Sequence, residues 1–183
     1  MRAIEVPEID GAFLLEPTPH ADERGFFCRT FDAEVLRSLG LDPHAFVQDS
    51  VSRSVRGVLR GLHLRSGAGE AKLVRCSYGR IFDVVVDLRP DSSTYRNRAF
   101  FELSGEEQTT LYIPAGCAHG FQALTDTADT SYRIDREHNP AEDVTIAFDD
   151  PEFAIPWPLP VTSMSQRDRE APRLAEVLEQ KGS

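Results

Sequence analysis

Residues 57–63, GVLRGLH, bring together side chains that could bind an anion and move a proton. The spacing predicts a strand with Arg60 and His63 on its inward face. Glycine within a strand is typical of a place where a ligand or another backbone comes close. A single histidine in a strand is often a hydrogen-bonded core residue, so its neighbours must decide between that interpretation and a catalytic one.

Positive charge is concentrated in the same region. Residues 50–80 hold seven basic residues and one acidic residue, a local net charge of +6, although the whole chain carries −10. This pattern predicts a site that attracts an anion. Arg60 is the strongest candidate, because a planar guanidinium binds two phosphate oxygens at once. The alternative, arginines that only solvate the outer face of a sheet, is favoured for Arg53, Arg56 and Arg75.

Composition narrows the class of protein. A chain of 183 residues with 40% apolar and 27% charged residues fits one globular domain spanning residues 1–183. The N-terminus lacks the pattern of a signal peptide, and no apolar run is long enough to span a membrane. Three cysteines without paired spacing favour a reducing compartment, so we expect a cytoplasmic protein with no membrane partner. The negative net charge argues against nucleic acid as a partner.

The order of apolar and turn-forming residues predicts an all-β protein. Asp32 and Gly40 would begin and end one helix at 32–39, and a second helix is expected at 171–180. Residues 149–160 are proline-rich and should form an extended arm. Many short strands joined by turns are typical of a sandwich or barrel. The expected strands are 12–15, 25–31, 45–51, 57–65, 71–77, 80–88, 98–103, 109–114, 119–124, 129–134 and 143–148.

Two segments resemble the metal motif of cupin barrels. The first runs from Gly57 through His63 to Glu70, and the second is PAGCAH, which ends in His119. The resemblance implies a cupin-type jelly-roll β-barrel with short flanking helices. Arg65 replaces the second histidine of the first motif and would repel a metal cation, so we expect no metal. A metal-dependent dioxygenase, with iron bound by the two histidines and the glutamate, stays open as an alternative.

Without a metal, a histidine, a lysine and a tyrosine suit proton transfer next to a carbonyl group. Such a reaction needs a base for the α-proton, a cation for the developing enolate oxygen and an acid on the opposite face. His63 is the candidate base, Lys72 the candidate enolate partner and Tyr132 the candidate acid. The alternatives are an exposed lysine at a strand start and a tyrosine packed in the core. Asp168 could orient the histidine, although a helix N-cap is its simpler interpretation.

Seven motifs, in order along most of the chain, resemble the dTDP-4-dehydrorhamnose 3,5-epimerase family, the deoxysugar epimerases with a cupin barrel. The motifs are DERGFF at 22–27, FVQDS at 46–50, GVLRGLH at 57–63, KLVRC at 72–76, FDVVVDLR at 82–89, IPAGCAHGF at 113–121 and DDPEFAIPWP at 149–158. The resemblance implies an isomerase that epimerises a nucleotide-activated 4-keto-6-deoxyhexose. No cofactor is expected, because the substrate's own carbonyl takes up the electron pair. The resemblance also implies a homodimer, in which we expect residues 12–15 to cross to the partner's sheet.

By position, the resemblance assigns a role to each of the residues that carry the chemistry. The base, its aspartate partner, the enolate-stabilising lysine and the tyrosine acid match His63, Asp168, Lys72 and Tyr132. The residues that hold the nucleotide phosphates match Arg24, Gln48 and Arg60, and the residue near the sugar matches His119. Departures from the family's usual Glu, Asn, Gln and Tyr fall around the substrate, at Arg29, Ser50, Arg65 and His138. We expect Arg29, Ser50 and His138 to contact the substrate.

The residues therefore predict a 3,5-epimerase that inverts both carbons next to the ketone. One alternative is a monoepimerase acting at carbon 3 or carbon 5 alone, since the added charge of Arg65 and His138 could fix one ring conformation. The metal-dependent dioxygenase is a second alternative. A non-catalytic module that binds nucleotide sugars is a third, but such a module would not need Lys72 or Tyr132.

Overall fold

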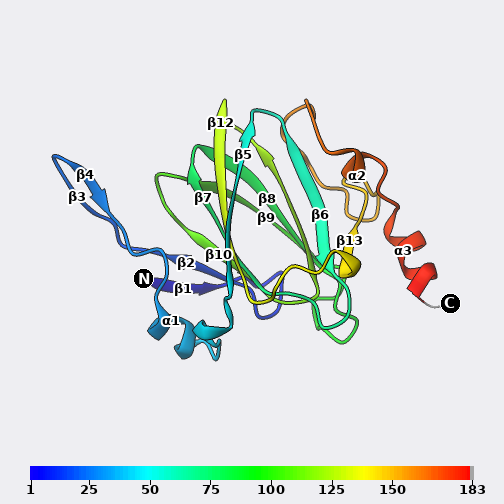
Figure 1. Cartoon of the computed structure of the whole chain (residues 1–183), viewed down its shortest axis with the longest axis horizontal. Coiled ribbons are helices and arrows are strands. Elements are labelled where there is room, and N and C mark those ends of the chain that lie inside the picture. Colours follow the sequence, from blue (N-terminus) through cyan, green and yellow to red (C-terminus); the bar gives the residue numbers. More distant parts are fainter. Residues whose placement is uncertain (182–183) are drawn as a thin grey trace.

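Two antiparallel sheets form the body of the protein in the computed structural model, which describes residues 1–181 (Figure 1). The six-stranded sheet has the order β1 (Arg2–Glu5), β2 (Phe13–Glu16), β10 (Thr110–Ile113), β7 (Lys72–Tyr78), β12 (Thr127–Ile134) and β5 (Gln48–Val55). The five-stranded sheet has the order β13 (Asp143–Thr145), β6 (Leu59–Arg65), β11 (Cys117–Ala123), β8 (Arg80–Asp87) and β9 (Arg98–Ser104). The predicted all-β fold of the cupin-like jelly-roll type is confirmed.

Most of the expected strands lie within one to three residues of their observed bounds. The largest difference is β5, which was expected at 45–51 but runs from Gln48 to Val55. Residues Pro43–Ala45 instead form a short 3-10 helix, η1, capped by the side chain of Asp42. The end of β5 alternates serines with Val51 and Val55, so its polar positions are one face of a continuous strand.

The helices are short and lie at the edges of the sheets. The expected helix at 32–39 is confirmed as α1 (Ala33–Ser38), and the side chain of Asp32 accepts the backbone N–H of Glu34 at 3.0 Å. The expected C-terminal helix is α3 (Leu174–Lys181), which begins after Pro172. Two short helices, α2 (Gln166–Arg169) and η2 (Pro140–Glu142), were not predicted. No helix within the described residues is long and apolar enough to cross a membrane.

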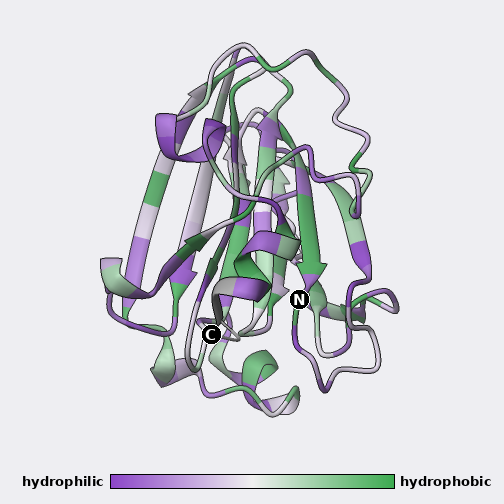
Figure 2. Cartoon of the chain, turned by 90° about the vertical axis from the view of Figure 1, so that its right-hand side faces the viewer, coloured by the Kyte–Doolittle hydropathy of each residue, from purple (hydrophilic) through white to green (hydrophobic). Residues whose placement is uncertain are grey.

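The inner faces of the two sheets enclose an apolar core. Val74 and Leu111 of the six-stranded sheet cluster there with Val85 and Phe121 of the five-stranded sheet, and all four are at most 1% exposed. Hydrophobic segments accordingly gather along the strands, whereas many loops are hydrophilic (Figure 2). Burial of these side chains is the main source of stability for the framework that carries the site.

The extended arm at 149–160 covers the outer face of the five-stranded sheet. Phe153 of the arm is fully buried in a second cluster with Leu62 and with Leu174 of α3. The carboxylate of Asp150 accepts the backbone N–H of Leu174 at 2.7 Å, which fixes the start of α3 to the arm. The arm thereby holds the C-terminal helices beside β6 and β13 (Figure 1).

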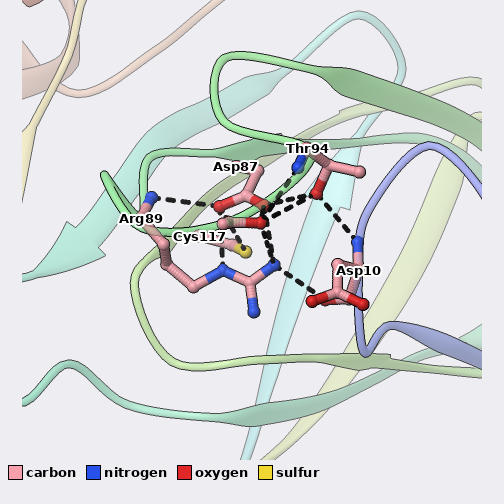
Figure 3. Close-up of polar contacts among 6 residues, drawn as sticks. Asp10, Asp87, Arg89, Thr94 and Cys117 are labelled. Atoms are coloured by element: carbon pink, nitrogen blue, oxygen red, sulfur yellow. Dashed lines mark hydrogen bonds and ion pairs between the residues drawn. The ribbon is translucent and has the colours of Figure 1, made fainter.

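A buried carboxylate joins the N-terminal loop to the end of β8 (Figure 3). Asp87 accepts hydrogen bonds from Arg89 Nη2, Ser92 Oγ and Thr94 Oγ1, each at 2.6 Å. Thr94 and Arg89 in turn bond the backbone N–H and carbonyl of Asp10, at 2.9 and 2.7 Å. Burial opposes ionisation of Asp87, but the hydrogen bonds from Arg89, Ser92 and Thr94 outweigh it and hold its pKa well below the ordinary value.

The N-terminal strands differ from the expectation that residues 12–15 cross to a partner. That prediction is wrong in this structure, because both edges of β2 are hydrogen-bonded within the chain, to β1 and to β10. A separate hairpin, β3 (His20–Asp22) and β4 (Gly25–Phe27), projects from the sandwich instead (Figure 1). Phe26 and Phe27 on this hairpin are 53% and 71% exposed.

Candidate active site

A bulge in β6 turns Arg60 and His63 toward the same cavity. The two residues are three positions apart and would point to opposite faces of a regular strand. In the pairing with β11, however, His63 lies opposite His119 and Arg60 lies opposite Phe121, so β6 contains one extra residue. Gly61 makes the bulge with φ of +130°, and a Cβ there would lie 2.6 Å from the Cα of Gly120. The predicted close approach at this glycine is confirmed.

A cavity of about 310 Å³ lies between the two sheets at this point. It is lined by Ser50, Ser52, Arg60, His63, Leu64, Arg65, Glu70, Lys72, His119, Phe121, Tyr132, Ile134, His138, Asp143 and Arg167. Seven of the predicted site residues are in this set: His63, Lys72, Tyr132, Ser50, Arg60, His119 and His138. These seven predicted residues, which span 88 positions from Ser50 to His138, thus meet in one space.

His63 is held by Asp168, which approaches from α2. The Nε2–H of His63 donates to Oδ1 of Asp168 at 2.6 Å, and the aspartate side chain is 4% exposed. Asp168 lies within α2, which Ser165 caps, and six residues before the last helix, α3, begins at Leu174, so the interpretation of Asp168 as the N-cap of the last helix is wrong. Burial opposes ionisation of Asp168, but the hydrogen bond and charge of His63 outweigh it and lower its pKa. Nδ1 of His63 is left to accept a proton.

Tyr132 lies on β12, on the opposite sheet from His63. Its hydroxyl is 3.4 Å from Oγ of Ser52, and its ring is 6.3 Å from the ring of His119, centroid to centroid. Burial is the largest effect on the phenol and raises the pKa of Tyr132 well above its ordinary value. The phenol therefore keeps its proton and is available as a donor.

His119 is locked by a carboxylate that sequence reasoning did not single out. Its Nε2–H donates to Oδ2 of Asp83 at 2.9 Å, and Asp83 is fully buried on β8. The sequence contains a feature that could have identified Asp83: it is a carboxylate within the apolar segment FDVVV, and a buried carboxylate needs a hydrogen-bonding partner.

Lys72 is buried rather than exposed at its strand start. Its side chain is 9% exposed, and its Nζ lies 3.1 Å from Oε1 of Glu70. The second oxygen of Glu70 lies 2.7 Å from Nε of Arg65, although that N–H does not point at the oxygen and the contact is ionic only. The alternative interpretation of Lys72 as a surface residue is therefore wrong.

The basic residues divide between the cavity and the outer surface. Arg60 lines the cavity, and its Nε and Nη2 donate to Oγ of Ser54 and to the carbonyl of Arg53. Arg53 itself pairs with Asp129, both Arg53 nitrogens lying 2.7 Å from the carboxylate. Arg75 bonds Gln108, and neither Arg53 nor Arg75 lines the cavity.

Three of the predicted substrate ligands lie outside the cavity of their own chain. Arg24 is at the turn of the projecting hairpin, is 84% exposed and pairs with Asp22 at 2.5 Å. Arg29 is 71% exposed and pairs with Asp32 at 2.9 Å. Gln48 begins β5 and is not a lining residue.

The donor set does not fit a metal ion. His63 is engaged by Asp168, His119 by Asp83, and Glu70 by two cations. Over residues 1–181 no group of three or more His, Cys, Asp and Glu side chains is arranged to hold one.

A larger cavity of about 640 Å³ near Tyr78 and Arg80 has no histidine or lysine in its lining and so offers no comparable base.

Comparison with known proteins assigns the family. The family model described as dTDP-4-dehydrorhamnose 3,5-epimerase matches residues 7–176. The chain belongs to this family. It is therefore an isomerase of the epimerase type, and the resemblance inferred from the motifs is confirmed. The dTDP-4-dehydrorhamnose 3,5-epimerase of Methanothermobacter thermautotrophicus is 44% identical over 164 residues, which cover 88% of each sequence.

Two solved structures of such epimerases resemble this chain closely. One is the dTDP-6-deoxy-D-glucose-3,5-epimerase of Legionella pneumophila in complex with dTDP-4-keto-L-rhamnose, with a TM-score of 0.89 and 40% identity. That similarity covers 95% of this chain and 93% of the other. The second is ChmJ, a 3′-monoepimerase from Streptomyces bikiniensis in complex with dTDP-quinovose, with a TM-score of 0.83 and 34% identity. It covers 94% of this chain and 88% of the other.

Proposed function

We propose that this epimerase inverts carbons 3 and 5 of a dTDP-4-keto-6-deoxyhexose without a cofactor. The observation that carries the proposal is the placement of His63 and Tyr132 on opposite sheets, with the same cavity between them. A sugar ring bound there has a base on one face and an acid on the other. Removal of a proton from one face and its return to the other is what inversion of a carbon requires.

Each transfer begins at His63. Nδ1 takes the proton from the carbon next to the ketone, the C–H electron pair forms a double bond to the carbonyl carbon, and the C=O π pair moves onto the oxygen to give an enolate. Asp168 stabilises the imidazolium that results, since its carboxylate already accepts the Nε2–H. Lys72 stabilises the enolate oxygen with its ammonium group. Tyr132 then donates its phenolic proton to the carbon from the opposite face, and the imidazolium and phenolate return to their starting forms by exchange with solvent.

The nucleotide part of the substrate is held by cations. Arg60 faces the cavity from β6 and is suited to a diphosphate, because its planar fork matches phosphate oxygens. His119, His138 and Ser50 line the same space and would contact the sugar or the phosphates. The diphosphate of a nucleotide sugar is negatively charged. It would be attracted to residues 50–80, where this acidic chain concentrates its positive charge.

We propose a homodimer in which the projecting hairpin reaches the partner's cavity. Arg24 lies on that hairpin, outside its own cavity, beside the exposed Phe26 and Phe27. Aromatic side chains left in water on a protruding hairpin are typical of an interface, and aromatic rings stack on bases. Light scattering at micromolar concentration should give twice the monomer mass. A fully active monomer would contradict this assembly.

Two further expectations belong to the same proposal. Residues 1–183 are taken to act as one catalytic domain. A cytoplasmic location stays a prediction that rests on the three unpaired cysteines, Cys28, Cys76 and Cys117.

The test is incubation with dTDP-4-keto-6-deoxyglucose in deuterated water, followed by NMR. Deuterium at carbons 3 and 5 of an L-configured product supports the proposal. Label at one carbon alone after long incubation would make the chain a monoepimerase, the alternative favoured by its similarity to ChmJ. Absence of label and product would overturn both. An oxygenase activity that a chelator abolishes and iron restores would support the metal-dependent dioxygenase instead.

A further inference from the structure

The buried carboxylate of Glu70 lies between two cations in the wall of the cavity. It is 2.7 Å from Nε of Arg65 through one oxygen and 3.1 Å from Nζ of Lys72 through the other. The three side chains are between 4% and 9% exposed. Buried charges are costly unless they are paired, and this group of three keeps a net charge of +1. A surplus positive charge at the edge of a cavity is suited to an anion that forms there.

Arg65 is fixed by contacts that do not involve Lys72. Its Nη1 donates to the backbone carbonyl of Glu137 at 2.9 Å, and its Nη2 lies 3.4 Å from Nδ1 of His138 and 3.8 Å from Oδ1 of Asp143. These contacts tie the guanidinium to the segment after β12 and to β13. Arg65 therefore stays in place if the lysine side chain moves.

Glu70 lies in the short loop between β6 and β7, whose backbone is held by hydrogen bonds from Ser66 to Glu142 and from Ala71 to Asp135, so its carboxylate is presented from a fixed position. The loop at 66–71 contains Gly67 and Gly69, both with positive φ. Lysine carries four rotatable side-chain bonds, so holding its ammonium group in one place has a large entropic cost. A carboxylate has two oxygens and can hold one cation with each, whereas an amide offers one acceptor and would turn its N–H₂ group toward the other cation. The carboxylate of Glu70 is thus the group that can link a fixed cation to a flexible one.

We propose that Glu70 is a positioning residue for Lys72 and that Arg65 is the anchor that holds Glu70. The inference rests on the enolate-stabilising role proposed for Lys72. The group aims the ammonium at the ketone oxygen before the proton leaves the neighbouring carbon. As the enolate forms, its negative charge meets the surplus charge of the group, so the stabilisation is greater in the transition state than in the bound substrate.

The test compares kcat, KM and deuterium uptake of dTDP-4-keto-6-deoxyglucose across a set of variants. Glu70→Gln should lower kcat by about 10- to 100-fold, the cost of a small misplacement, with KM changed by less than about threefold. In a Lys72→Met background the same change should have no further effect on the residual rate of deuterium uptake. The reason is that a positioning residue acts only through the group that it positions.

Two more variants separate this role from a structural one. The double change Arg65→Gln with Glu70→Gln should restore part of the activity lost by Glu70→Gln alone. The two amides can then bond each other and leave a carbonyl oxygen for Lys72. Glu137→Gln is the matched control. It makes the same change at an exposed glutamate that does not line the cavity and that Arg65 contacts only through its backbone carbonyl, so kcat should equal that of the wild type.

Thermal unfolding of each variant shows which of them fold. The inference would be overturned if Glu70→Gln lowered the rate of deuterium uptake equally in the wild-type and Lys72→Met backgrounds. It would also be overturned if Glu70→Gln changed KM alone, or if the double variant of Arg65 and Glu70 recovered no activity. These outcomes leave the proposed function intact when the wild type epimerises the substrate. A wild type that neither takes up deuterium nor forms product would overturn the proposed function, and the inference with it.

Discussion

His63 and His119 lie directly opposite each other on β6 and β11, and each donates its Nε2–H to a different carboxylate. The partner of His63 comes from a helix outside the sandwich, whereas the partner of His119 comes from β8 within it. The side chain of His63 is 40% exposed and that of His119 is 5% exposed. The two neighbouring imidazoles thus differ in their surroundings: the ring of His63 is accessible for the proton exchange proposed for it, whereas the ring of His119 is buried and fixed by Asp83.

Replacement of His63, the proposed base, should stop the first step of the proposed reaction. His63→Asn is expected to abolish deuterium uptake at carbons 3 and 5, since a general base contributes ~10²–10⁴-fold. Asp168→Asn should lower kcat with little change in KM, because the amide cannot stabilise the imidazolium. The control is His44→Asn, which changes an exposed histidine of η1 that does not line the cavity. Wild-type uptake by His63→Asn would contradict the assignment.

Replacement of Tyr132, the proposed acid, should separate proton exchange from inversion of the carbon. In Tyr132→Phe the enolate still forms, so deuterium uptake continues while epimerised product falls by ~10²–10⁴-fold. NMR of the sugar distinguishes retained from inverted labelled carbons. Tyr78→Phe, which removes the hydroxyl of a tyrosine that is 61% exposed and outside this cavity, should behave as the wild type. A parallel loss of uptake and product would show that Tyr132 has another role.

The bulge at Gly61 should be sensitive to one added methyl group. Gly61→Ala would place a Cβ 2.6 Å from the backbone of Gly120 at a φ of +130°, so both β6 and the position of His63 must shift. We expect a loss of stability and of kcat together. Gly67→Ala has a positive φ but no atom within 4 Å of the added Cβ, and should cost only ~1–2 kcal/mol. Urea unfolding and kcat measure both effects. Equal stability losses would contradict the argument from close approach.

The carboxylate of Asp87 should make stability depend on pH in the acid range. Its pKa is held below the ordinary value in the folded state, so its contribution is fully present above the unfolded pKa of ~3.9 and is lost as the pH falls below it. Asp87→Asn should cost ~3–5 kcal/mol at neutral pH, because the guanidinium of Arg89 loses its buried partner, and should flatten the pH dependence. Asp129→Asn, which breaks a pair with the exposed Arg53, should cost ~0–1 kcal/mol. Unfolding free energies between pH 3 and pH 7 test this; similar costs for both variants would contradict it.

The three cysteines should differ in reactivity. Burial raises the pKa of Cys76 to about 11 and that of Cys117 to about 12, so neither forms the reactive thiolate near neutral pH. Cys28 is only half-buried. A thiol reagent at pH 8 should modify Cys28 in the folded enzyme and all three cysteines in denaturant. Rapid modification of Cys117 in the folded state would show that the barrel opens.

The sequence predicted the elements whose pattern is local. Alternation and turn residues placed β7, β8 and β9 within a residue of their bounds, and Asp32 marked the start of α1. Helix α2 escaped prediction because four residues are too few to show a helical period. The end of β5 was not predicted because polar residues in a strand usually face solvent, whereas serines of β5 face inward toward a polar cavity.

The residues of the site were easier to identify than their contacts. Types and motifs selected His63, Lys72 and Tyr132 correctly as residues of one cavity. The contact between His63 and Asp168 spans 105 positions, and no local pattern reports such a distance. The sequence pattern indicates only a metal-ligand role for Glu70, because its contacts with Arg65 and Lys72 arise only when the end of β6 and the start of β7 are brought together.

Because the proposed base, His63, and the proposed acid, Tyr132, lie on separate sheets, the distance between the sheets is a parameter of the proposed reaction. Packed sheets lie about 10 Å apart, and that gap is set by the side chains between them. Phe121 belongs both to the buried core and to the cavity lining. A smaller residue there would let the walls approach, and a larger one would separate them, in each case changing how far a proton must travel. Repacking this core at Phe121 is therefore expected to alter the distances from His63 and Tyr132 to a bound sugar ring without changing either residue.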